Sequence, residues 1–165
     1  MHMQEFTYRL LEDGTFAVMG YRGDEEHVVI PADRNITVIY DCLFRDHKEI
    51  RSVSIPDTVT DLGEFVFDGL TGMSHLKLPR DLVHLWGKTF IRCGLEEIVL
   101  PEHVTTIPPF AFKDCIRLKK VVLNDSLLRV QAWAFAGCVN IREFIHGSNT
   151  WISPEAFLSK ELNQG

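Results

Sequence analysis

The chain has 165 residues, of which 45% are hydrophobic and 24% charged, and its formal net charge is −6 at pH 7. That length predicts a single domain with a real hydrophobic core. The basic residues are scattered, which disfavours nucleic acid and anionic membranes as main partners, because both attract clustered positive charge. No stretch approaches the ~18–20 apolar residues that a membrane span needs.

The first 27 residues predict a β-hairpin that caps the fold. Residues 6–11 alternate loosely, Asp13-Gly14 is a hairpin turn signal, and the apolar run 16–19 follows it. The start of the chain lacks the basic residues and the apolar run of a secretory signal peptide. We therefore expect a cytoplasmic protein as the sequence stands, or a cell-surface or secreted one if a leader has been removed.

From residue 28 on, the sequence repeats itself about every 23 residues. The clearest marker is one phenylalanine per repeat, at intervals of 23, 23, 22, 23 and 22 residues: Phe44, Phe67, Phe90, Phe112, Phe135 and Phe157. Four prolines keep the same step: Pro31, Pro56, Pro79 and Pro101. Such a period predicts a solenoid, in which stacked units bury one continuous core that no unit could bury alone.

Each unit predicts a short sequence of elements. An alternating apolar run before each proline slot, as in Val53-Ser54-Ile55, predicts a short strand that stacks with its copies in one parallel sheet. A second small parallel sheet is expected around residues 60–62 and 105–107. The segments that lead into each phenylalanine, such as 109–112, predict 3₁₀ or one-turn helices. The six phenylalanines then stack along the solenoid axis.

The unit from Ile98 to Leu118, IVLPEHVTTIPPFAFKDCIRL, resembles the BspA-like leucine-rich repeat of bacteria. That family's pattern is an apolar strand and proline, then Val-Thr, an Ile-Gly or similar pair, Ala-Phe, Cys or Asn, and Leu. The resemblance covers about residues 28–158. It implies a leucine-rich-repeat solenoid of about six units over residues 28–165, in one domain with the hairpin cap of residues 1–27. It also implies a bacterial surface role, such as adhesion to a host or matrix protein.

The residues that could carry chemistry predict neither an enzyme nor a cofactor or metal site. No nucleotide loop, nucleophile elbow, zinc signature or calcium loop is present in the sequence. Cys93, Cys115 and Cys138 each lie three residues after a repeat phenylalanine. We interpret them as small buried residues whose S–H groups can bond a turn carbonyl, without disulfides between units.

A binding surface is the functional feature that the repeat predicts. Of the two outward columns of the first sheet, one carries mixed charge and the other turns apolar over its last three members. An exposed apolar ridge on a solenoid marks a candidate docking site, although β-branched residues also simply suit exposed strands. The candidate protein-binding face consists of Lys77, Val99, Lys120, Val122, Glu143 and Ile145. Trp151 and Trp133 could extend it, but Trp133 occupies the slot of Phe110, which packing explains as well.

The leading hypothesis is a protein–protein interaction or adhesion module that uses this face and the C-terminal coil, with an unidentified protein as partner. The alternative is a structural protein that assembles with itself, for example as a homodimer, through a C-terminal coil without a cap. A weaker third hypothesis is glycan binding. It requires exposed aromatic residues over a groove with paired carboxylates, and the sequence shows no such pair on one column.

Overall fold

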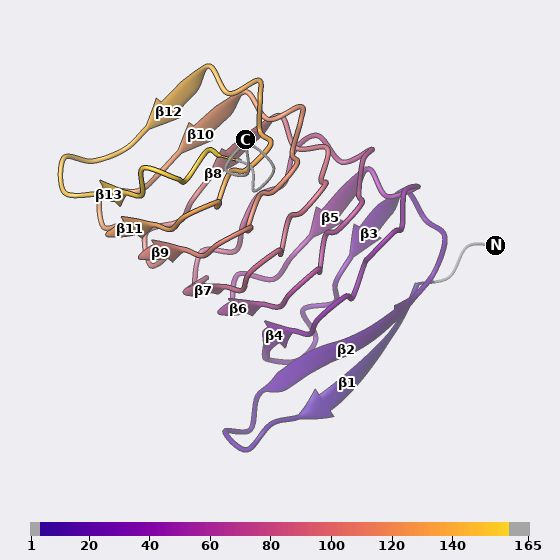
Figure 1. The fold of residues 1–165 in the computed structure, drawn as a ribbon. Coiled ribbons are helices and arrows are strands. Elements are labelled where there is room, and N and C mark those ends of the chain that lie inside the picture. Colours follow the sequence, from indigo (N-terminus) through magenta and orange to yellow (C-terminus); the bar gives the residue numbers. More distant parts are fainter. Residues whose placement is uncertain (1–3, 159–165) are drawn as a thin grey trace.

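The protein is a β-solenoid, described here by a computed structural model for residues 4–158 (Figure 1). Its strands are β1 (Glu5–Leu10), β2 (Phe16–Arg22), β3 (His27–Val29), β4 (Ile36–Ile39), β5 (Ser52–Ser54), β6 (Asp61–Leu62), β7 (His84–Leu85), β8 (Glu97–Val99), β9 (Thr106–Ile107), β10 (Lys120–Val122), β11 (Arg129–Val130), β12 (Glu143–Ile145) and β13 (Trp151–Ile152). The mostly-β solenoid that the repeat predicted is therefore confirmed.

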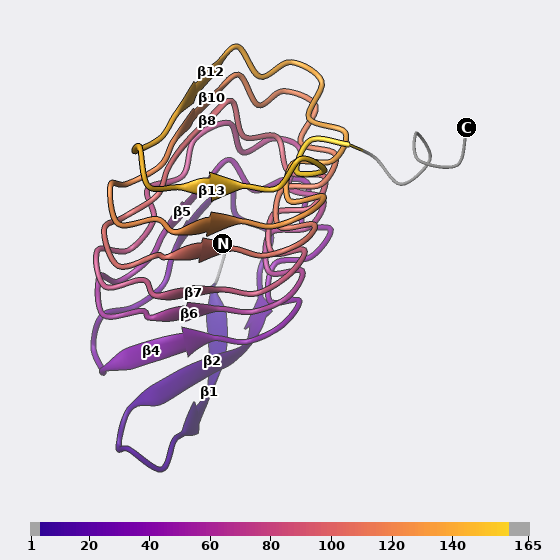
Figure 2. The ribbon, with the colours of Figure 1, turned by 60° about the vertical axis from the view of Figure 1, so that its left-hand side comes forward.

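The strands line two sides of the stacked coils, and the core lies between them (Figures 1 and 2). The first side holds the pair β3-β5 and the three-stranded sheet β8-β10-β12. The second side holds β1-β2-β4-β6-β7 and, beyond it, β9-β11-β13. All pairings except that within the hairpin are parallel, as the two predicted parallel sheets require.

The predicted N-terminal hairpin is present. Strands β1 and β2 pair antiparallel, and β2 pairs parallel with β4, so the hairpin continues the second side of the solenoid. The Gln4 side chain covers the outer edge of β3: its amide donates to the His27 carbonyl at 2.8 Å and accepts from the Val29 N–H at 3.0 Å. Where the cap ends and the repeats begin stays a prediction.

The repeat phenylalanines form the predicted stack. Successive ring centroids lie 6.0, 5.1, 4.9, 5.1 and 5.6 Å apart from Phe44 to Phe157. The first five rings are fully buried, whereas Phe157, in the last coil, is 42% exposed. At the other end the ring of Tyr21 from the hairpin meets Phe44 edge-on at 5.1 Å. The cap thus continues the aromatic core.

The expected one-turn helices are wrong: the described residues contain no helix. Each segment around the first five repeat phenylalanines is a run of turns with a left-handed residue at both ends, such as Phe65 with φ 59° and Gly69 with φ 80°. Left-handed residues break a helix. In addition, alternate N–H groups donate to the next coil, as Phe67 does to the Thr89 carbonyl at 3.0 Å, which removes them from any helical ladder.

The C-terminal coil is described as far as residue 158. Strands β12 and β13 each pair with one neighbour, β10 and β11. Residues 159–165, where the sequence predicts no C-terminal cap, lie outside the described residues.

Replacing Phe112 with Ala should lower the free energy of unfolding by about 3–5 kcal/mol, because it leaves a cavity between two stacked rings. Phe157→Ala is the matched control at the exposed end of the same stack, and it should cost less than half as much. Urea unfolding followed by circular dichroism measures both. Equal losses for the two variants would contradict a continuous buried stack.

Candidate protein-binding face

The predicted face lies mainly on one sheet, whose register brings its residues together. Strands β8, β10 and β12 align Val99 with Val122 and Val122 with Ile145. The same pairings align Lys120 with Glu143 on one side and with Glu97 on the other. Five of the six predicted face residues therefore sit on adjacent strands, in two columns.

Exposure along these strands alternates as a one-sided sheet requires. The middle residues Ile98 and Val121 are buried in the core, whereas Val99 is 52% and Ile145 47% exposed. Val122, between them, is half-buried. The three form a continuous apolar ridge. Beside it, the charged column has a lysine between two glutamates, an arrangement in which opposite charges on neighbouring strands attract one another.

Lys77, the sixth predicted residue, lies where the first side of the solenoid is interrupted. The segment 75–78 should form a strand between β5 and β8, but it pairs with neither. At its start the Glu96 N–H donates to the Ser74 carbonyl at 2.8 Å; from His75 to Leu78 no described residue continues that ladder.

A groove of about 700 Å³ opens at this interruption. Its lining includes the edge of the ridge at Val99 together with charged side chains that the sequence did not single out: Asp57, Arg80 and Glu97. The positions of these three residues in the repeat do not predict a groove, because the groove forms only where the strand ladder is interrupted. The predicted face therefore continues at its N-terminal side into a hollow lined by both apolar and charged residues.

The two tryptophans do not extend the face. The Trp133 ring stacks on Phe110 with centroids 5.4 Å apart, so packing explains it. Trp151 belongs to β13, which lies on the second side of the solenoid. Its ring has the Arg129 guanidinium 5.5 Å above its centroid.

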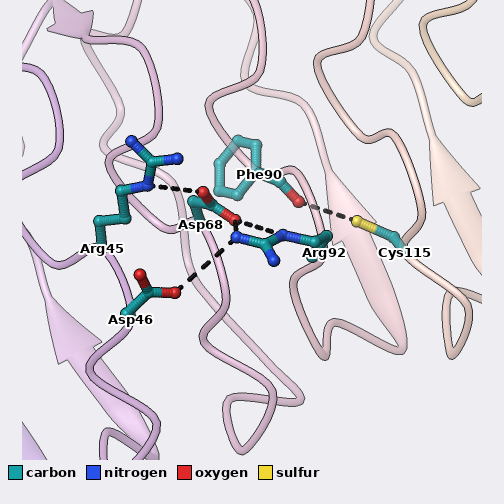
Figure 3. A network of polar contacts seen from close by, with 6 residues as sticks. All are labelled: Arg45, Asp46, Asp68, Phe90, Arg92 and Cys115. Carbon is teal, nitrogen blue, oxygen red and sulfur yellow. Dashed lines mark hydrogen bonds and ion pairs between the residues drawn. The ribbon is translucent and has the colours of Figure 1, made fainter.

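A buried carboxylate on the turns between the two sides is held by two arginines (Figure 3). Asp68 is 1% exposed, and its oxygens contact Arg45 Nε at 2.9 Å and Arg92 Nε and Nη2 at 2.9 and 2.8 Å. Arg92 Nη2 also lies 3.8 Å from the Asp46 carboxylate. Because the three main partners come from three successive coils, the network ties those coils together and leaves no free acid or base.

Three of the four cysteines are buried and occupy the predicted role. Cys115 and Cys138 donate their S–H groups to the carbonyls of Phe90 and Phe112, at 3.0 and 2.9 Å. Burial raises the pKa of Cys93 to about 12 and raises that of Cys115 well above the usual value. These thiols are therefore protonated near neutral pH and are poor nucleophiles. Cys42 is exposed, and all four cysteines are free.

Within residues 4–158, no group of three or more His, Cys, Asp or Glu side chains is placed to hold a metal ion. The same part of the chain holds no helix with the length and apolarity to cross a bilayer.

Stacked coils with parallel strands on two sides and one buried phenylalanine each define a solenoid repeat protein. Over residues 28–163 the sequence matches the BspA type leucine rich repeat region in six copies. The chain belongs to this family, as the resemblance in its repeat unit indicated. It has no significant match among curated proteins.

Solved structures of bacterial leucine-rich repeat proteins share the fold. The Treponema pallidum leucine rich repeat protein is 23% identical, with a TM-score of 0.70 over 96% of this chain and 90% of its own. A Bacteroides ovatus leucine-rich repeat protein is 26% identical, with a TM-score of 0.69 over 94% of this chain and 50% of its own. A leucine rich cell surface protein of Faecalibacterium prausnitzii is 21% identical, with a TM-score of 0.62, over 88% and 54%.

Removing the two arginines around Asp68 should destabilise the fold more than removing the carboxylate. Arg45→Met with Arg92→Met leaves a buried charge without a partner, which is costly. Asp68→Asn leaves two exposed arginines that water can solvate. We expect a lower urea midpoint for the double arginine variant than for Asp68→Asn. The reverse order would show that the network does not stabilise the carboxylate.

The native protein should show one fast-reacting thiol at pH 8 in an assay with a chromogenic disulfide. Cys42 is exposed, whereas the other three thiols are buried, and burial raises the pKa of Cys93 and Cys115. Denaturation should release all four. Cys42→Ser is the control and should abolish the fast phase. A second fast thiol in the native protein would contradict the closed core.

Proposed function

We propose that this chain is a non-enzymatic protein-interaction module that binds a partner protein through the first side of the solenoid. The observation that carries the proposal is the apolar ridge of Val99, Val122 and Ile145, which lies in register on three adjacent strands beside a groove. Adhesion to a host or matrix protein is the form of this activity that the family resemblance favours.

The ridge has the composition of an interface centre. Specific protein interfaces combine a desolvated apolar centre with a polar rim. Here the ridge supplies the centre, while Lys120 and Glu143 stand beside it on the same strands. Lys77 lines the groove at one end. A partner that covers the ridge would bury three β-branched side chains and meet alternating charges along one side.

The groove adds main-chain recognition. The edges of β5 and β8 that face the segment 75–78 form no strand ladder with it within the described residues. An extended segment of a partner can pair with such edges by main-chain hydrogen bonds, and the side chains around it supply the specificity.

The alternative of self-assembly through the C-terminal coil has a structural basis in its last two strands, each of which has an unpaired edge within the described range. Parallel edges of this kind can pair with another copy. Light scattering distinguishes this function from binding to a different protein, since a monomer at high concentration would not support assembly.

The double substitution Val122→Glu and Ile145→Glu tests the proposed face. It should weaken partner binding by about tenfold or more, because each new carboxylate would have to lose its water on binding. The double variant and the unchanged protein would each be used to capture partners from an extract of the organism that produces the protein, and the captured proteins compared by quantitative mass spectrometry. The affinity of each for the purified partner would then be measured by biolayer interferometry.

Val29→Glu is the matched control, because Val29 occupies the same outward column on β3, across the groove, and is 57% exposed. It should leave binding intact. If the double variant keeps every partner and the oligomeric state of the unchanged protein, the proposed siting is wrong.

A further inference from the structure

A second hollow, of about 420 Å³, lies on the opposite side of the solenoid from the proposed protein-binding face. Its lining includes two aromatic side chains, Tyr40 and Trp86, and between them in the repeat stands Gly63. We call this hollow the aromatic slot. It is separate from the groove at residues 75–78, which shares none of its lining residues.

The register of the second sheet explains the slot. Strands β4, β6 and β7 pair in parallel, with Ile39 opposite Leu62 and Leu62 opposite Leu85. Tyr40, Gly63 and Trp86 are the residues that directly follow the three strands. Neighbouring strands are ~4.8 Å apart, so the backbone positions of the two aromatic residues are separated by about 9–10 Å, and Gly63 adds no side chain between them.

Only glycine fits the middle position. A Cβ on Gly63 would lie 2.8 Å from the Asp41 backbone nitrogen and also too close to the Asp41 carboxylate. That carboxylate accepts the Glu64 N–H at 2.9 Å, which holds it at the slot. The gap between the rings is therefore a fixed feature of the backbone.

The two rings lack the partners that other exposed aromatic residues have. Among the described residues, the exposed aromatic side chains are Tyr40, Trp86, Trp151 and Phe157. Trp151 has Arg129 above its ring, and Phe157 stacks on the core. No described ring or cation packs on Tyr40, which is 45% exposed, or on Trp86, which is 53% exposed.

The charge of the slot selects its ligand. Asp41, Asp61 and Glu64 contribute to its lining, which among the described residues contains no lysine, arginine or histidine. None of the three carboxylates forms an ion pair with a described residue. Because the backbone positions of the two aromatic residues are about 9–10 Å apart, a cation that enters between them can come within the ~6 Å range of cation–π attraction. The rings and the hollow define the site, and the carboxylates give it a preference for positive charge.

We propose that the aromatic slot binds the cationic side chain of an arginine or lysine from a partner protein. The protein uses the same chemistry within its own fold, where Arg34 lies 3.8 Å from the Tyr8 ring centroid and Arg45 lies 4.3 Å from that of Phe65. In the slot both aromatic residues are present, and no described residue of the chain places a cation on either ring. The partner supplies it.

Fluorescein-labelled hexa-arginine and hexa-lysine peptides are the probes, and binding is followed by fluorescence anisotropy at 0.15 M salt. A hexa-citrulline peptide controls for size without charge. We expect at least one cationic peptide to bind, the citrulline peptide not to bind, and Trp86→Ala to weaken binding by about tenfold. Trp86→Ala leaves the net charge unchanged, so the loss would report on the ring and not on general attraction to an acidic protein.

Trp151→Ala is the matched control, since Trp151 is exposed on the same side but already covered by Arg129. It should retain binding, as should Tyr40→Phe, while Tyr40→Ala should lose it. Circular dichroism confirms that each variant is folded. Equal binding by Trp86→Ala and the unchanged protein overturns the proposal. So does Trp86-dependent binding of a neutral oligosaccharide without binding of the cationic peptides, which would make the slot a glycan site. Neither outcome depends on the ridge of β8, β10 and β12.

Discussion

The structure depends on the hydrogen bonds that hold each coil in register with the next at the phenylalanine turns. The N–H of a stacked phenylalanine donates to the neighbouring coil, as Phe44 does to the Val66 carbonyl at 3.0 Å and Phe112 to the Ala134 carbonyl at 2.8 Å. These bonds fix the spacing of the coils near one strand separation, and the rings therefore stack at nearly the same distance. A ring cannot move along the axis without breaking the ladder beside it.

Strict register makes each surface a set of columns, and the exceptions within a column create the sites. A repeat position filled by similar side chains in successive coils gives a ridge, as at Val99 and Val122. A repeat position without a side chain gives a hollow, as at Gly63. A segment that leaves the ladder, as residues 75–78 do, gives a groove. The groove and the hollow therefore arise from departures from the repeat, whereas the ridge arises from the repeat itself.

The sequence predicted what the period determines and missed what single coils do differently. The spacing of the phenylalanines was enough to predict the stack, while the alternating runs predicted the parallel sheets and the outward columns, and the repeated cysteine position predicted the bonding of the buried thiols. The turns were mispredicted because their left-handed positions hold residues such as Phe65, Lys88 and Trp133, which carry no local signal for that conformation. Bonds between coils impose it. Residues 75–78 have the residue types of an ordinary strand, so the sequence did not predict that the ladder is interrupted there. The aromatic slot did have a signal, since Tyr40, Gly63 and Trp86 are 23 residues apart.

The interior holds polar groups that are already paired, and both proposed binding sites lie on the outer sides. Asp68 is neutralised by two arginines, and the thiols of Cys115 and Cys138 donate hydrogen bonds to carbonyls. The exposed surfaces of the two sides differ. One side has an apolar ridge with alternating charges on β8, β10 and β12, and the other has an acidic hollow with two aromatic residues by β4, β6 and β7. These surfaces lie on opposite sides and in different halves of the stack, so they have no residue in common.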